Sequence, residues 1–118
     1  GVLATWQFGA AIGLVTAIFA RLGSRPKISA RQLLRPVAVL VAFVAAMSAV
    51  SGVVGFLSAA HGAGRLHDSL AWNVPQSAHD RFLAALWAHR GAYVSSYVGS
   101  VFLWAWITWS RSRCATGA

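Results

Sequence analysis

The sequence has little charge, two acidic residues and one cysteine. Charged residues make up 10% of its 118 residues, whereas about 25% is usual in soluble domains, so an ordinary soluble domain is disfavoured. The single Cys114 excludes an internal disulfide framework and a multi-cysteine zinc site. The only carboxylates, Asp68 and Asp80, lie beside cations, which argues against a tuned acid/base pair. We therefore expect no enzyme.

Hydrophobic residues are abundant instead, at 58% of the chain, and this excludes a disordered tail. They form three uncharged runs, over residues 2–20, 37–59 and 91–107. Each run is close to the roughly 20 helical residues that cross a bilayer. We expect an all-α integral membrane helical bundle with three transmembrane helices, in a single transmembrane domain over residues 1–118.

The expected boundaries follow from turn and capping residues. The segment Ser29–Gln32 has the pattern of a capping box, in which two side chains each satisfy a free backbone N–H at a helix start. The sequence predicts helices over residues 2–21, 29–60 and 78–110, a cytoplasmic turn over 22–28 and an outer loop over 61–77.

The basic residues set the expected orientation. Ten Lys and Arg against two acids give a net charge of +8. The seven that flank the apolar runs near the turn and the C-terminus are Arg21, Arg25, Lys27, Arg31, Arg35, Arg111 and Arg113. Cytoplasmic segments are enriched in such cations, so we place the turn and the C-terminus inside and the N-terminus of this segment outside. No basic helix with base-stacking aromatics lies outside the apolar runs, so we expect no nucleic-acid partner.

Small residues recur at four-residue spacing along all three expected helices. These candidate helix-packing residues are Gly9, Gly13, Gly52, Gly55, Gly91, Ser95 and Gly99. Apolar lipid gives helices little reason to meet, so association depends on close packing and interhelical hydrogen bonds. The small-residue faces either pack this chain against itself or dock a partner helix.

Four histidines all lie on the expected outer side. His61 and His89, from different helices, are weak candidates for haem ligands, but both lie near water rather than in a bundle interior. His67 and His79, each followed by an aspartate, are weak candidates for metal ligands, but their spacing matches no compact zinc motif. We expect no cofactor and ordinary interfacial hydrogen bonds.

Three segments carry a family resemblance: GVLATW at residues 1–6, ARLGSRPKISARQLLRP at 20–36 and RFLAALWAHRGAYVSSYVG at 81–99. With the Ala20–Lys27 turn and the Leu86–His89 block, the chain resembles a family of small uncharacterised bacterial multi-pass membrane proteins with no assigned activity. The resemblance implies a four-helix protein of the bacterial cytoplasmic membrane. We therefore expect that a fourth helix, at the N-terminal side, is missing from this segment.

The absence of a reactive constellation sets the expected role. We expect a non-catalytic structural or accessory subunit of a membrane assembly, whose partners are the lipid bilayer and other membrane subunits. The alternative is a membrane module that binds or senses a small ligand, metal or haem at its outer face.

Overall fold

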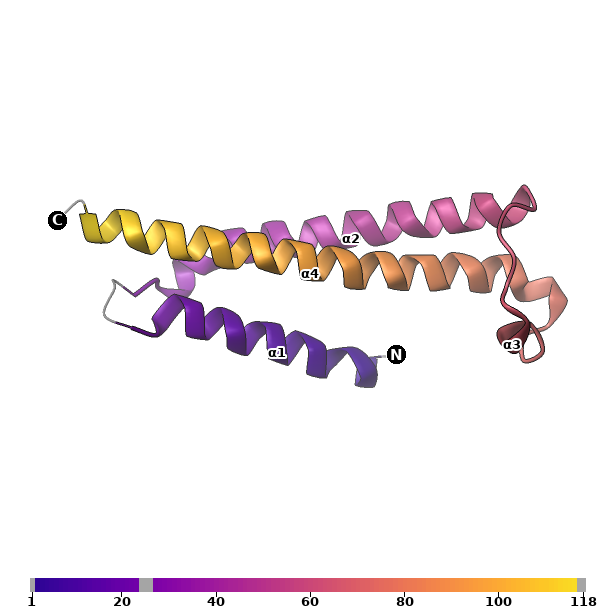
Figure 1. Cartoon of the computed structure of the whole chain (residues 1–118), viewed down its shortest axis with the longest axis horizontal. Coiled ribbons are helices and arrows are strands. Elements are labelled where there is room, and N and C mark those ends of the chain that lie inside the picture. Colours follow the sequence, from indigo (N-terminus) through magenta and orange to yellow (C-terminus); the bar gives the residue numbers. More distant parts are fainter. Residues whose placement is uncertain (1, 24–26, 117–118) are drawn as a thin grey trace. The chain divides into compact units, whose positions relative to one another are not determined.

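The computed structural model describes residues 2–23 and 27–116, and within them the chain is helical without any strand. The elements are α1 (Val2–Arg21), α2 (Ala30–Ala60), α3 (Asp68–Ala71), the 3-10 turn η1 (Gln76–Ala78) and α4 (His79–Thr116) (Figure 1). The predicted all-α class is confirmed. The last helix runs past the predicted end at residue 110, because arginine is a good helix former and does not stop a helix.

The predicted capping box is present at the start of α2. The backbone N–H of Ser29 donates to Oε1 of Gln32 at 2.9 Å, and the backbone N–H of Gln32 donates to Oγ of Ser29 at 3.4 Å. Because both side chains answer each other's backbone donors, the helix has a defined first turn. The Ser29 hydroxyl also donates to Gln32 Oε1 at 3.0 Å.

Among the helices of residues 2–23 and 27–116, α2 alone is long and apolar enough to cross a membrane. Its most apolar stretch has a mean hydropathy of 2.5, and none of that stretch is buried inside the structure. In α1, Gly9–Arg21 forms a shorter apolar segment. The uncharged part of α4 contains serines, tyrosines and tryptophans, which lower its mean hydropathy.

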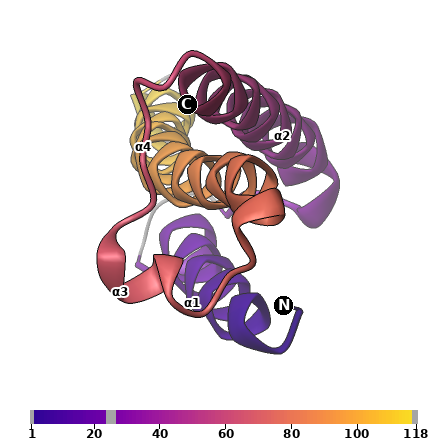
Figure 2. The same ribbon diagram turned by 90° about the vertical axis from the view of Figure 1, so that its right-hand side faces the viewer.

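The helices fold into two compact units, and α2 and α4 each contribute to both. The second unit, Val41–Tyr97, pairs the end of α2 with the start of α4. Ser48 donates to the carbonyl oxygen of Ala88 at 3.0 Å, whereas Gly55, further along α2, lies against Trp87, earlier in α4. The two helices are therefore antiparallel and side by side (Figures 1 and 2).

Glycines permit this close approach. A Cβ on Gly55 would lie 2.7 Å from Cβ of Trp87, and a Cβ on Gly91 would lie 2.6 Å from Cβ of Ser51. Both separations are shorter than van der Waals contact, so a larger residue would push the helices apart. Gly52 is less constrained, since its added Cβ would lie 3.2 Å from Cβ of Ala88.

The first unit combines Gly1–Leu40 with Val98–Ala118. The indole N–H of Trp104 donates to Oγ1 of Thr16 at 3.0 Å, and the ring of Trp104 stacks on Phe19 with centroids 5.7 Å apart. The buried face of α4 here comprises Ser100, Leu103, Ile107 and Arg111. Their spacing of three or four residues places them on one side of the helix.

We expect Gly91→Ala to destabilise the second unit by about 1–3 kcal/mol, the usual cost of overpacking. Thermal unfolding of the purified chain, followed by circular dichroism, measures it. Gly13→Ala is the matched control, because a Cβ there meets nothing within 4 Å and alanine favours helix over glycine by about 1 kcal/mol. Equal loss of stability in both variants would contradict the close approach at Gly91.

Candidate functional site: the basic end of the first unit

The first unit contains seven of the ten Lys and Arg residues and neither of the two acidic residues. Most of these cations lie where helices end or begin. We call the following set the basic end: Arg21, Lys27, Arg31, Arg35, Arg111 and Arg113. Arg25, also predicted to orient the chain, lies outside the described residues. The set comes from segments that are far apart in the sequence, and contacts of Arg111 join them.

Arg111 caps the C-terminus of α1. Its guanidinium donates to the carbonyl oxygen of Phe19 through Nη1 and to that of Leu22 through Nη2, the latter at 2.8 Å. The side chain is only 5% exposed. A planar guanidinium with several N–H groups can serve two carbonyls at once, and a cation is favoured at the negative end of a helix dipole.

The other carbonyls of this helix end are also satisfied. The N–H of Leu22 donates to the carbonyl of Ile18 at 2.8 Å, and the N–H of Ile28 donates to that of Ala20 at 3.2 Å. Gly23 adopts a φ of 93°, a left-handed conformation that glycine tolerates and that commonly ends a helix. Arg111 thus completes the hydrogen bonding of a sharp helix end.

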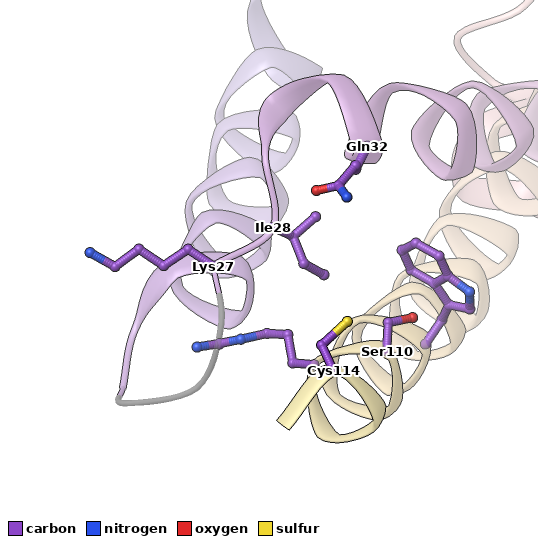
Figure 3. Close-up of a pocket in the computed structure, with 7 residues that line it drawn as sticks. Lys27, Ile28, Gln32, Ser110 and Cys114 are labelled. Atoms are coloured by element: carbon purple, nitrogen blue, oxygen red, sulfur yellow. The ribbon is translucent and has the colours of Figure 1, made fainter. Parts of the chain in front are cut away.

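A pocket of about 320 Å³ lies beside this cap. Its lining residues are Lys27, Ile28, Gln32, Trp106, Ser110, Arg111 and Cys114. Figure 3 shows Ile28 and Gln32 directed into a space that Ser110 and Cys114 border from α4, while the ammonium of Lys27 points outward. The lining thus combines cationic, neutral hydrogen-bonding and apolar side chains.

The histidines do not form a site of this kind. All four belong to the second unit, and the described part of the chain holds no group of three or more metal-ligating side chains. His61 Nδ1 lies 2.8 Å from the carbonyl of Leu57, and His79 Nε2 lies 2.9 Å from that of Val74. His89 contacts the ring of Tyr93 edge-on, and His67 is exposed. A nitrogen that donates to a carbonyl cannot also bind a metal, so these contacts favour ordinary hydrogen bonding.

The predicted packing residues fall into two groups. Gly52, Gly55 and Gly91 lie where α2 meets α4, and Ser95 is buried with its hydroxyl donating to the carbonyl of Gly91 at 2.6 Å. Gly9 and Gly13 are exposed, and no atom lies within 4 Å of a Cβ added at either. Gly99 is half-buried. A packing role for the α1 glycines stays a prediction.

Sequence reasoning missed the structural role of Arg111. Its position after an apolar run indicated membrane orientation only, because the sequence does not show which helix end lies beside it. The hydrogen bond between Trp104 and Thr16 was missed for the same reason. Threonine within an apolar run, facing a tryptophan-rich run, was the available indication.

Comparison with known proteins gives no match: no family model, curated protein or solved structure is significantly similar to this chain.

We expect Arg111→Met to destabilise the end of α1, because two carbonyls lose their donors at about 1–3 kcal/mol for a buried unsatisfied group. Trypsin should then cleave faster after Arg21 and Lys27, with a lower melting temperature. Arg113→Met is the control: it removes the same charge from an exposed residue whose guanidinium lies 4.0 Å from the Trp109 ring centroid. Cleavage at the wild-type rate in Arg111→Met would contradict the capping role.

Proposed function

We propose that this chain is a multi-pass integral membrane protein that serves as a non-catalytic structural or accessory subunit of a membrane assembly. The observation that carries the proposal is the apolar surface of α2. Its most hydrophobic stretch is wholly unburied, and Val39, Val41 and Val53 are 65%, 62% and 58% exposed. Burial of such surface is worth about 25 cal/mol per Å², so an apolar solvent is favoured over water.

The other long helices support the same setting. In α4, Val94, Val101 and Phe102 are 63%, 60% and 71% exposed. A soluble monomer rarely exposes contiguous apolar patches beyond a few hundred Å². The 20 residues of α1 reach about 30 Å at 1.5 Å per residue, the thickness of a hydrocarbon core. We therefore propose three crossings, by α1, α2 and α4.

The basic end supports an orientation. Within the first unit α1 and α4 run in the same direction, since Thr16 contacts Trp104 and Phe19 contacts Arg111. Both helices end at the basic end, and α2 begins there. Cations retained on the cytoplasmic side would place this end inside. The loop between α2 and α4 would then lie outside, as would the start of α1.

An accessory role is favoured by the open face of α1. Gly9 and Gly13 lie one helical turn apart on an exposed face with free space above them. Small residues let a second backbone approach closely, which is how helices associate in lipid. The described side chains present no arrangement suited to covalent or acid/base chemistry.

Membrane insertion and orientation can be tested together. We expect the chain to remain in the membrane pellet after alkaline carbonate extraction. A reporter inserted after Lys27 should be cytoplasmic, and one inserted after His67 should be external. Release by carbonate would contradict membrane integration, while integration with both reporters on the same side would contradict three crossings.

The subunit role predicts a partner on the α1 face. Mild-detergent purification from native membranes should recover a stoichiometric membrane protein, identified by mass spectrometry. Gly9→Leu combined with Gly13→Leu should abolish its recovery, because the larger side chains block close approach. The control, Val39→Leu with Val50→Leu, changes exposed residues of α2. A chain that purifies alone would contradict the role.

A further inference from the structure

We propose that the pocket at the basic end binds a phosphate-bearing anion, either the headgroup of an anionic phospholipid or a free phosphate ester. At about 320 Å³ the pocket lies at the small end of the usual range for ligand sites, roughly 300–1,000 Å³. This suits a headgroup rather than a large organic cofactor.

Electrostatics selects an anion. The lining includes two cations, Lys27 and Arg111, and no acidic residue. No aspartate or glutamate occurs anywhere in the first unit, which has five further cations. A concave surface lined by charge of one sign concentrates the field and attracts the opposite charge. Arg111 is held in the wall by the carbonyls of Phe19 and Leu22, so its charge is fixed in place.

The neutral lining residues supply hydrogen-bond donors. Gln32 uses its Oε1 to accept from Ser29 at 2.9 Å and 3.0 Å, which fixes the amide so that its NH₂ group is the part left to donate. Ser110 offers a hydroxyl from the opposite wall (Figure 3). Phosphate oxygens only accept hydrogen bonds when ionised, so a donor-rich lining suits them.

The rim explains how a lipid could enter. Lys27 is exposed and its ammonium points away from the pocket (Figure 3), where its flexible stem can follow an approaching phosphate. Ile28 and Trp106 give the lining an apolar part that suits the glycerol and acyl start of a lipid. Basic pockets between helices on the cytoplasmic side are a known form of headgroup site. The lipid source rests on the proposed membrane setting, whereas the phosphate chemistry does not.

The only cysteine makes the pocket measurable, because Cys114 is exposed and lies in its lining. The chain is reconstituted in vesicles of phosphatidylcholine alone or mixed with phosphatidylglycerol, and the rate of reaction with uncharged N-ethylmaleimide is measured. We expect phosphatidylglycerol to slow labelling at least about fivefold, the factor that one favourable Lys or Arg contact supplies near a charged membrane.

Two charge-matched variants separate a site from a general surface effect. Lys27→Gln should remove most of the protection by phosphatidylglycerol, and Gln32→Ala should weaken it. Arg35→Gln removes the same charge from a residue outside the lining and should keep protection within about twofold, since exposed charges are screened over about 10 Å. Equal loss of protection in Lys27→Gln and Arg35→Gln would overturn the proposal.

A further arm identifies the source of the phosphate. Inorganic phosphate or glycerol phosphate is added to the phosphatidylcholine vesicles at constant ionic strength. Protection by the soluble anion, lost in Lys27→Gln, supports the site with a free ester as its ligand, whereas protection by phosphatidylglycerol alone supports a lipid headgroup. Labelling that no phosphate species slows overturns the site. Flotation with the vesicles is scored separately, so a chain that floats but shows no protection contradicts only this inference.

Discussion

The amount of apolar surface that the chain leaves unburied is the constraint on which its other features depend. The buried hydrophobic residues of the described chain are Ala20, Leu83, Leu103 and Ile107, whereas valines, leucines and aromatics line the outside of α2 and α4. Three long helices offer too little mutual contact to cover themselves. In the membrane setting proposed above, lipid covers this surface, and the helix lengths and the position of the basic residues follow from the thickness of the bilayer.

A lipid-like surrounding changes what holds the helices together. Apolar side chains gain little by leaving lipid for a helix interface, so packing and hydrogen bonds must supply the attraction. The second unit uses close packing at Gly55 and Gly91 and the bond from Ser48 to Ala88. The first unit uses polar contacts instead, from Trp104 to Thr16 and from Arg111 to two carbonyls.

How far the sequence predicted the structure depended on whether a feature is local. The capping box at Ser29 and Gln32 was predictable because both partners lie within one turn. Four-residue spacing likewise defines a face of a helix, but it does not name the helix opposite. The spacing is the same at Gly9 and Gly13 as at Gly91 and Ser95, yet only the latter pair lies in a contact between helices. The pocket depends on segments that are far apart in the sequence, so no local pattern could reveal it.

Arg111 links the orientation of the chain to its packing. A lysine would serve positive-inside orientation equally well, but only a guanidinium offers a planar fork that reaches two carbonyls. The carbonyl ends of α1 and α4 carry partial negative charge, while the start of α2 at the same end carries partial positive charge. The helix dipoles therefore offset only a small part of the seven cations in a unit without acidic residues. The remaining positive charge has to be balanced from outside the unit, and phosphate groups at a membrane surface are a source of negative charge at that depth. On this reasoning the surplus of cations that orients the chain also makes its basic end a site for anions.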